Sequence, residues 1–269
     1  PSGEIFRLGG RAHEPVGPTN LLQLFVGSEG TLGVITEVTL RLIPKPAARG
    51  TVMAAFGRLD DAARAVMAVL DSGVVPLALE MMDQVTLRCV EEYLRSGLPV
   101  ESEAMLLIDV DGDPSTVAAD LEIVAAACRT NGGDPVRLGA SAQEVEHLWR
   151  ARRVVSSSFG RLRPNKLGED ISVPRAAIPE TVRRIQEIAR RHQLLIPLFG
   201  DIGDGNLHPN ILCDLRDADE MVRVATAARE IFAVAVELGG TLSGEHGIGL
   251  LKKEFLGCGV TPEAIAMMR

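Results

Sequence analysis

The sequence has few aromatic residues, little excess positive charge and no long apolar run. Aromatic residues make up 3% of its 269 positions, and its formal net charge is −8. Single-stranded nucleic acid is bound by stacking bases on aromatic rings, and any nucleic acid requires clustered positive charge. We therefore expect no nucleic-acid partner. No apolar run approaches the ~18 residues that would predict a transmembrane helix.

Cysteine is also scarce, and its spacing excludes two classes of small domain. The four cysteines are scattered without a CxxC pair: Cys89, Cys128, Cys213 and Cys258. This pattern is typical of reduced thiols in a cytoplasmic protein, not of a disulfide framework or a zinc finger. The sequence begins at Pro1, and we interpret it as a piece of a longer protein whose targeting signal, if any, lies elsewhere.

The spacing of apolar residues predicts an α+β fold. Predicted strands alternate with predicted helices, the strands at residues 51–56, 74–80, 104–110, 135–138, 170–173, 195–199 and 206–212 and the helices at 59–70, 114–130 and 178–192. Repeated β-α-β units joined by hairpins indicate ferredoxin-like split-βαβ repeats, which form an antiparallel sheet with helices on one face. Two further helices are predicted at 141–159 and 219–238. A Pro- and Gly-rich break places a domain boundary between residues 47 and 48.

The N-terminal part contains a glycine-rich loop at residues 27–33. The loop has three glycines in seven residues and lies between an apolar run at 21–26 and an alternating, strand-like segment at 34–43. A short strand is also predicted at 5–8. Such a loop brings backbone N–H groups close to a phosphate or a ring carbonyl. The alternative is a β-turn rich in glycine, because the loop matches neither the Walker pattern nor a glycine motif that opens a helix.

Residues 199–210 carry a strong hairpin signal. Asp204 and Gly205 lie between two apolar runs, and a two-residue turn there would place Asp201 opposite His208. Directly opposed residues have Cβ atoms about 5 Å apart, so that a carboxylate and an imidazole could share one divalent cation. The alternative is an ordinary turn with a histidine on the surface.

Two further segments add candidate site residues. The loop at residues 243–249 contains Glu245 and His246 among three glycines, and thus a second carboxylate and a second imidazole. The predicted helix 141–159 carries several arginines, of which Arg152 shares a face with Ser156, four residues later. An inward-facing arginine could bind a substrate carboxylate through two hydrogen bonds, whereas an exposed one would be surface charge.

Three motifs taken together resemble the FAD-linked oxidases of the vanillyl-alcohol-oxidase type, at residues 26–37, 203–208 and 243–249. They most resemble the D-2-hydroxyacid dehydrogenase subgroup, which includes glycolate oxidase catalytic subunits, D-lactate dehydrogenases and D-2-hydroxyglutarate dehydrogenases. The likeness covers nearly the whole chain, and the motifs occur in family order. It implies that residues 1–47 are the C-terminal portion of an FAD-binding domain and that residues 48–269 are the substrate-binding cap domain.

The resemblance also implies an activity and a set of site residues. A flavoprotein of this kind oxidises a D-2-hydroxy acid, of the glycolate, D-lactate or D-2-hydroxyglutarate type, to the 2-oxo acid by metal-assisted hydride transfer to FAD. His246 matches the catalytic base, and the substrate would contact Arg152, Ser156 and Lys166. The metal ligands would be Asp201, His208 and Glu245. The flavin would lie against Gly27, Ser28, Glu29, Gly30, Thr31, Gly33 and Ile35.

One ligand position departs from the family pattern, because Asp201 stands where the family has histidine. Zinc is the expected metal, but a carboxylate is a harder ligand that weakens zinc binding and favours manganese or magnesium, so that manganese is the alternative and occupancy stays open. Asp201 also favours an alternative function, that of a non-catalytic subunit of a flavin oxidase complex whose metal site has decayed. A transferase resembling alkyl-dihydroxyacetonephosphate synthase is a further alternative.

The same resemblance sets expectations for partners and location. Electrons would pass to a quinone, a cytochrome, an electron-transfer flavoprotein or oxygen, and the protein would form a homodimer or a hetero-oligomeric complex. We expect a cytoplasmic location, with peripheral attachment to the inner membrane as the alternative. The segment alone is expected to be inactive and to retain FAD poorly, because most of the FAD-binding domain would lie upstream.

Overall fold

The computed structural model describes residues 2–9 and 20–268, and the chain forms two compact units, Pro1–Pro44 and Lys45–Arg269. In the first unit, α1 (Leu21–Phe25) is the only regular element among the described residues 2–9 and 20–44. The side chain of Asn20 caps this helix by accepting a hydrogen bond from the N–H of Leu22 at 3.1 Å. None of the described helices is long and apolar enough to cross a membrane.

The strands predicted at residues 5–8 and 34–43 are absent, which corrects the sequence-based prediction. Both segments are irregular in the described part of the first unit. A strand is stable only when its backbone N–H and C=O groups pair with a neighbour, and no partner strand is present there. The apolar side chains of the second segment are accordingly uncovered, with Val34 and Leu42 each 87% exposed.

The first half of the second unit has the ferredoxin-like strand order. It comprises β1 (Ala48–Phe56), α2 (Leu59–Asp71), β2 (Ala78–Asp83), β3 (Ala104–Gly112), α4 (Pro114–Thr130) and β4 (Gly133–Gly139). The strands are antiparallel in the order β4-β1-β3-β2. The strand predicted at 74–80 begins later, because the turn at Gly73 (φ +86°) and Pro76, which lacks an N–H, keep residues 74–76 out of the ladder.

The second half repeats this order with a shortened fourth strand. It comprises β5 (Asn165–Gly168), β6 (Ile171–Ser172), α7 (Ile178–His192), β7 (Leu198–Asp201), β8 (Asn206–Cys213) and α8 (Ala218–Glu237). β8 pairs with both β7 and β6, and the position of the fourth strand is taken by a single bridge between Ser172 and Thr241. The halves join through antiparallel β2 and β7, where Glu80 pairs with Asp201. The predicted fold class is therefore confirmed.

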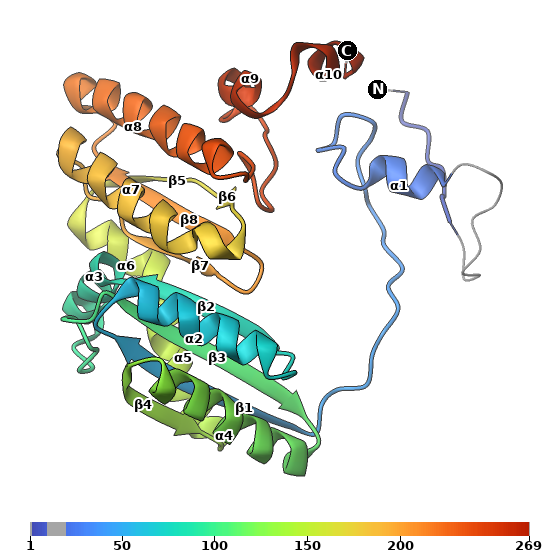
Figure 1. Ribbon diagram of the computed structural model, residues 1–269. Helices are drawn as coiled ribbons and strands as arrows, with labels where there is room; N and C mark the ends of the chain where they lie inside the picture. Colours follow the sequence, from blue (N-terminus) through green and yellow to red (C-terminus); the bar gives the residue numbers. More distant parts are fainter. Residues whose placement is uncertain (1, 10–19, 269) are drawn as a thin grey trace. The chain divides into compact units, whose positions relative to one another are not determined.

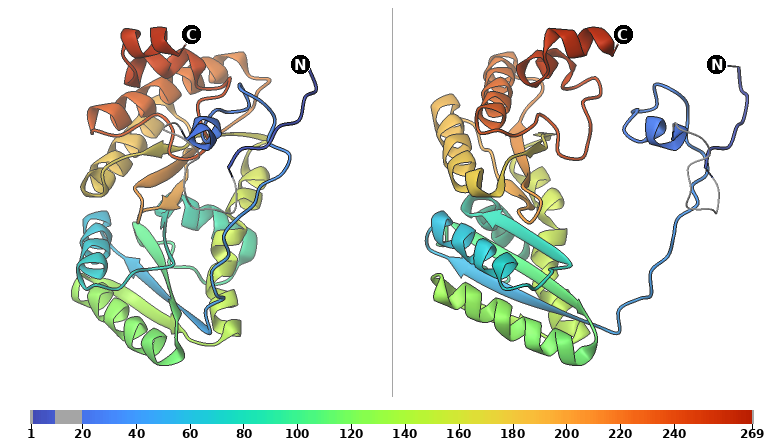
Figure 2. Two further views of the ribbon diagram at one scale, coloured as in Figure 1. Left: turned by 90° about the vertical axis from the view of Figure 1, so that its right-hand side faces the viewer. Right: turned by 45° about the vertical axis from the view of Figure 1, so that its right-hand side comes forward.

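Successive residues of the central strands enter two different cores. Ile108 and its like-facing neighbours pack against α2, α4, α7 and α8, which cover one face of the sheet as predicted (Figures 1 and 2). Leu107 faces the other way, into a second core with α3 (Gln84–Leu94), α5 (Ala142–Arg153) and α6 (Val155–Leu162). These three helices add a layer on the second face. The helix predicted at 141–159 is interrupted at Val154, after which α6 buries Val155 and Phe159 in this core.

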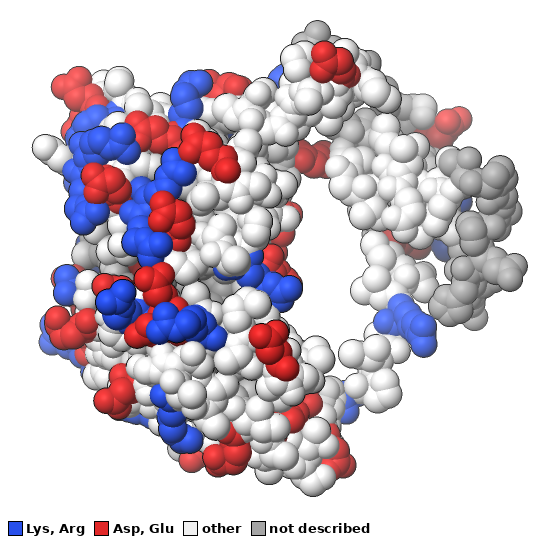
Figure 3. Space-filling view, viewed as in Figure 1, with Lys and Arg blue, Asp and Glu red and all other residues white. Residues whose placement is uncertain are grey.

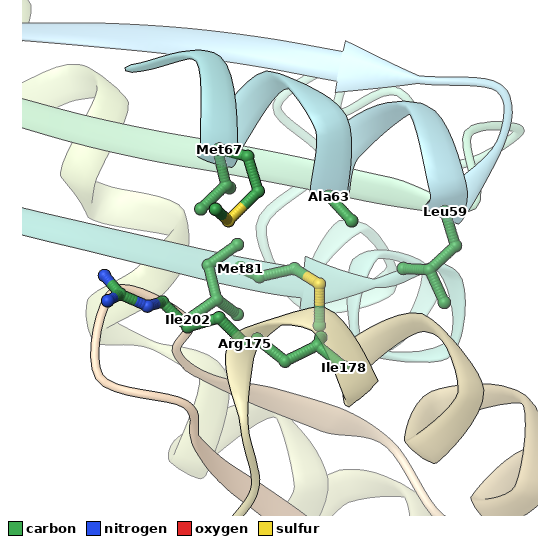
Figure 4. A pocket seen from close by; sticks show the side chains of 8 residues that line it. Leu59, Ala63, Met67, Met81, Arg175, Ile178 and Ile202 are labelled. Atoms are coloured by element: carbon green, nitrogen blue, oxygen red, sulfur yellow. The ribbon is translucent and has the colours of Figure 1, made fainter. Parts of the chain in front are cut away.

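The face covered by α2, α4, α7 and α8 is closely packed where the two halves meet. Figure 4 shows Met67 of α2, Met81 of β2 and Ile178 of α7 around a cavity of about 10 Å³, room for about one water. Exposed ion pairs join Arg183 to Asp60 and Arg184 to Glu237, and charges of both signs are interspersed over this face (Figure 3). The cavity on this face is too small for an organic substrate. A short 3-10 turn, η1 (Arg175–Ala177), precedes α7, and after α8 come the short segments η2 (Lys253–Phe255), α9 (Leu256–Gly259) and α10 (Pro262–Met267).

Candidate active site

A polar cavity of about 340 Å³ lies on the second face, where β2, β7 and β8 meet α5 and the 243–249 loop. It is lined by Glu80, Arg152, Ser172, Asp201, Asp204, Asn206, His208, Gly244 and Glu245. Strand alternation explains this set, because the residues of β2, β7 and β8 that point away from the first core point into the cavity. The volume is suited to a small organic acid.

The hairpin between β7 and β8 exists, but its predicted register is wrong. Phe199, not Asp201, is opposite His208, and the connection is the four-residue turn 202–205. The physical reason is Ile202, which is 1% exposed and whose N–H donates to the carbonyl of Leu79 at 3.0 Å. Burying Ile202 in the first core lengthens the turn. Since the register differs by two residues, Asp201 and His208 still share a face, and both line the cavity.

His208 lies between two rings. Its ring centroid is 5.4 Å from that of Phe199 and 5.4 Å from that of His246, with which it stacks at 18°. Its Nε2 is 3.4 Å from Oε1 of Glu245. Burial lowers the pKa of His208 below its usual value, which favours the neutral imidazole that metals bind.

Among the described residues, His208, Glu245 and His246 form a possible metal-binding group. Their ligand atoms lie within 4.8 Å of one another. Two imidazoles and a carboxylate are a donor set suited to zinc or another divalent transition metal. Asp201 lies in the same cavity but is not a member of this group. Its Oδ1 accepts the N–H of Gly203 at 3.0 Å, within its own turn.

The electrostatic surroundings of Asp201 disfavour its charge. Burial is the main cause that raises its pKa, and the nearby carboxylates of Asp204 and Glu80 act in the same direction. Asp201, Asp204 and Glu80 thus form an acidic wall of the cavity. In that wall Glu80 is neutralised by Arg152.

Arg152 faces the cavity and is already paired. Its Nε donates to Oε2 of Glu80 at 2.8 Å, and its guanidinium carbon lies 4.5 Å from the centre of the Phe199 ring. Trp149 on the same helix donates from Nε1 to the buried carboxylate of Asp109 at 2.7 Å, which anchors α5 on the sheet. Tertiary contacts therefore place Arg152 inward.

The other two predicted substrate residues pair with each other outside the cavity lining. Ser156 and Lys166 are exposed, form a hydrogen bond with each other and are not among the described lining residues. The interruption at Val154 separates Ser156 from the helix that carries Arg152. The structure thus brings one of the three predicted substrate residues to the cavity.

The 243–249 loop is attached to a buried carboxylate. The N–H groups of Gly244, Glu245 and His246 donate to Oδ2 of Asp170 at 2.7, 2.6 and 3.0 Å. Gly244 packs against Asn206, and a Cβ at this position would have to displace the Asn206 side chain. Glycine is therefore needed here for close approach.

Sequence reasoning missed several residues of this site. Asn206 follows the Asp204-Gly205 turn and lines the cavity, and its Oδ1 is buried against Gly244 without a hydrogen-bond partner in the described part of the chain. Glu80, Asp170 and Lys252 have no local sequence signal, because their roles depend on partners 72 to 82 residues away.

The seven predicted flavin-contacting residues lie in one loop of the first unit. Three of its positions have left-handed backbones, with φ of +78° at Gly27, +50° at Glu29 and +75° at Gly30. Added Cβ atoms at Gly27 or Gly30 would meet nothing within 4 Å. Thr31 closes the loop by donating from Oγ1 to the carbonyl of Ser28 at 2.6 Å.

Comparison with known proteins identifies relatives over the whole chain. The family described as FAD linked oxidases, C-terminal domain, matches residues 45–269. The chain is 41% identical to glycolate oxidase subunit GlcD of Bacillus subtilis over 268 residues, which is 100% of this chain and 57% of that protein. It is 29% identical to a probable mitochondrial D-lactate dehydrogenase of Danio rerio, covering 99% of this chain and 54% of that protein. The chain thus spans about half the length of these relatives.

Solved structures with the same fold are more distant in sequence. An alkyldihydroxyacetonephosphate synthase superposes with a TM-score of 0.62 at 16% identity, over 90% of this chain and 49% of that one. A p-cresol methylhydroxylase superposes with a TM-score of 0.58 at 14% identity, over 74% of this chain and 45% of that one. At these identities the likeness shows the fold alone.

Proposed function

The chain belongs to the FAD linked oxidase C-terminal domain family, and from that premise we propose that the full-length protein oxidises a short D-2-hydroxy acid to the 2-oxo acid with FAD. The observation that carries the proposal is the convergence of Arg152, His208 and Glu245 at one polar cavity, with the ring of His246 stacked on that of His208. A guanidinium can bind a substrate carboxylate, and an imidazole can accept a hydroxyl proton. Oxidation of a 2-hydroxy acid requires both tasks.

We assign the two units different roles in this reaction. Residues 48–269 would form the substrate-binding cap, and residues 1–47 the end of an FAD-binding domain, with the described loop from Gly27 to Ile35 against the flavin. The exposed apolar side chains of the first unit support this assignment, since they form a surface suited to further strands of a larger domain. The open backbone around Gly27 and Gly30 fits close approach to a ring.

The residues of the chain would bind, orient and deprotonate the substrate. Arg152 would hold the carboxylate, in place of or beside Glu80, and so fix the orientation of C2. His246 would accept the proton of the 2-hydroxyl group. When bound, FAD supplies the redox chemistry by accepting the hydride that leaves C2. The substrate thereby loses one proton and one hydride and becomes the 2-oxo acid.

We propose that a divalent metal, zinc or manganese, binds to His208 and Glu245. The fit rests on the donor set, on the 3.4 Å between His208 Nε2 and Glu245 Oε1, and on the neutral form of His208 that burial favours. A metal at this position would hold the 2-hydroxyl oxygen of the substrate. Asp201 would contribute from the cavity wall, as a direct ligand or through a water.

The charge of the cavity favours a substrate with a single carboxylate. Arg152 is the only lysine or arginine among the described lining residues, and it faces four carboxylates there, those of Glu80, Asp201, Asp204 and Glu245. A dicarboxylate would bring a second negative charge to this acidic wall without a second basic side chain to bind it. Glycolate or D-lactate therefore fits better than D-2-hydroxyglutarate.

The proposal is tested by flavin reduction in the full-length, FAD-loaded protein without oxygen. Glycolate, D-lactate, L-lactate and D-2-hydroxyglutarate are mixed with the protein in turn, and bleaching of the flavin absorbance is followed. We expect glycolate or D-lactate to reduce the flavin fastest. The proposal is wrong if none of the four acids bleaches it. Metal analysis of the same sample gives the occupancy, and the electron acceptor follows from adding quinone, cytochrome or oxygen to the reduced protein.

One alternative retains support from a specific residue. Asp201 replaces the histidine expected at a ligand position, as a subunit with a decayed metal site would. Absence of both metal and flavin reduction would favour that non-catalytic subunit. A transferase acting on a long alkyl chain fits less well, because charged and polar residues line the cavity.

A further inference from the structure

The strand beside β8 is interrupted at the point where the site is built. β5 and β6 pair with β8 in one continuous register, with Gly168 opposite Asn210 and Ile171 opposite Leu207. The same register places Asp170, in the gap, beside His208. Pro209 lies across the gap and cannot donate to the ladder, so that only its carbonyl is used, by the N–H of Glu169 at 2.9 Å. The interruption frees Asp170 to bind another segment.

Asp170 binds the loop that carries the proposed base. Its carboxylate is fully buried, with 0% of the side chain exposed, and Oδ2 accepts three successive N–H groups at residues 244–246. The hydroxyl of Ser243 donates to the same carboxylate at 3.3 Å, and its Oγ also accepts the N–H of Gly247 at 2.8 Å. One buried side chain thus fixes four consecutive residues of a glycine-rich loop that contains no helix or strand.

Lys252 completes the buried cluster. It is 3% exposed, and its Nζ donates to Oδ1 of Asp170, to the Asp170 carbonyl at 2.7 Å and to the Leu242 carbonyl at 3.0 Å. Lysine is almost never buried unless it is paired, and here all three of its donors have acceptors. Burial opposes ionisation of Asp170, but the hydrogen bonds from Lys252 and from the loop N–H groups outweigh it, and the pKa of this carboxyl lies below its usual range.

We propose that Asp170, paired with Lys252, is the positioning residue that holds Glu245 and His246 in their working geometry. Oδ1 of Asp170 is 3.7 Å from Nδ1 of His246, and Nε2 on the opposite side of the ring is 3.6 Å from Oε1 of Glu245. Nδ1 thus lies on the side of the buried carboxylate, at ion-pair distance, and Nε2 lies on the side of Glu245. The role of His246 as proton acceptor rests on the proposed function, whereas the attachment of the loop to Asp170 does not.

The test compares Asp170→Asn with Asp83→Asn in the full-length, FAD-loaded protein. Asp83 is a matched control, because it is also 0% exposed and its Oδ1 accepts two N–H groups, from Thr86 at 2.8 Å and Leu198 at 3.1 Å. Amide hydrogen exchange of a peptide containing residues 244–246 reports loop attachment without any substrate. We expect Asp170→Asn to speed this exchange by at least ~10-fold and Asp83→Asn to leave it unchanged.

Kinetics then show whether the attachment serves catalysis. We expect Asp170→Asn to lower kcat by about 100-fold with a change in KM of less than about 3-fold, since misplacing a reacting group by about 1 Å costs this much. In a His246→Ala background, the same change should lower kcat much less than in the wild type, because only its action through Glu245 remains. Asp170→Glu keeps the charge opposite Lys252 but moves the carboxylate, so it tests position even if Asp170→Asn does not fold.

The possible failures are distinguishable. The inference is overturned if the Asp170 variants retain both slow exchange and normal kcat, or if the losses from Asp170→Asn and His246→Ala simply multiply. If no 2-hydroxy acid reduces the flavin of the wild-type protein, the proposed function fails, and the exchange comparison alone decides whether Asp170 holds the loop.

Discussion

The two halves of the second unit follow one strand order and differ in how completely the order is built. In the first half, β1 has nine residues and β4 has seven. Their counterparts in the second half are β6, with two residues, and the single bridge at Thr241. The chain leaves the sheet there and forms the 243–249 loop. Glu245 and His246 thus lie just after the point where the strand pairing of the second half ends.

The same contrast appears in the polar groups of the second face. In the first half, buried Asp109 is satisfied internally by Thr51 at 2.5 Å, by Trp149 at 2.7 Å and by an ion pair with Arg49. In the second half, His208 and Asn206 face a cavity. A satisfied network stabilises one arrangement, whereas polar groups facing a cavity remain available to a ligand. We infer that the first half mainly supports the fold and that the second half supplies most of the polar groups that line the cavity.

The largest expected effect is from His246→Ala in the second half. Removing the proposed base should lower the rate of flavin reduction by about 10³-fold while the fold is retained, since His246 is more than half exposed. Stopped-flow absorbance with D-lactate or glycolate measures this rate. His147→Ala, at an exposed histidine of α5, is the control and should behave as wild type. Equal rates for the two variants would contradict the proposal that the 243–249 loop carries the catalytic base.

One core substitution in each half should show whether the two halves contribute differently to stability and to catalysis. Ile108 in β3 and Ile211 in β8 are both 0% exposed, and each change to Ala should lower the free energy of unfolding by about 3 kcal/mol. Ile108→Ala should leave kcat of the folded protein unchanged, because β3 supplies no cavity residue. Ile211→Ala should also change kcat or KM a few-fold, because His208 is in the same strand. Urea denaturation measures the free energy of unfolding, and steady-state assays measure kcat and KM. Identical kinetics for both variants would contradict the inferred difference between the two halves.

Arg152→Met tests the contribution of α5, which reaches across from the first half. The variant should raise KM by about 100-fold, because a charged hydrogen-bond pair with the substrate carboxylate is lost and Glu80 is left without its partner. Arg153→Met is the matched control, since Arg153 is exposed and pairs with exposed Glu146. Similar KM values for the two variants would show that Arg152 is not the carboxylate-binding residue.

The split-βαβ order and the position of the site could be predicted from the sequence, because both depend on local signals. Apolar periodicity located α4 with its observed ends, Pro114–Thr130, and the motifs around His208 and Glu245 located the cavity. The hairpin register could not be predicted, because the length of its turn depends on burial of Ile202 against α2 and β2.

The errors have a common physical origin in contacts between distant parts of the chain. Residues 34–43 have a strand pattern without a strand partner in the described structure. The pairing of Asp170 with Lys252 joins residues 82 positions apart and leaves no periodic signal. Ser156 has a helical spacing from Arg152 in the sequence, but α5 ends at Arg153 and Ser156 lies in α6. Local patterns therefore predicted which segments matter, and tertiary packing decided which atoms meet.

A smaller effect is expected on the pH dependence of stability. Burial raises the pKa of Asp83 in the first half to about 6 and that of Glu169 in the second half to about 7, from ordinary values of 3.8 and 4.5. For an acid whose pKa is higher in the folded state, folding favours the protonated form. The free energy of unfolding should therefore fall as the pH rises through these windows, by about 1.4 kcal/mol for each unit by which the pKa of a group is raised.

Replacing each acid should remove its own part of this slope. Asp83→Asn should flatten the dependence between about pH 4 and 6, and Glu169→Gln between about pH 4.5 and 7. Urea denaturation at a series of pH values measures both. A slope that survives Glu169→Gln would show that Lys252, 3.9 Å away, keeps Glu169 ionised in the folded protein.

The smallest expected effect concerns the acidic wall of the second half. Asp204 lines the cavity but is exposed, so that its charge is partly screened by water. Asp204→Asn should lower KM for D-2-hydroxyglutarate about 3-fold relative to KM for D-lactate, because one repulsion of the second substrate carboxylate is removed. Asp71→Asn, at an exposed acid on α2 in the first half, is the control and should leave the ratio unchanged. Adding salt should shrink the difference between wild type and Asp204→Asn, whereas a salt-independent difference would indicate direct contact between Asp204 and the substrate instead of a general repulsion.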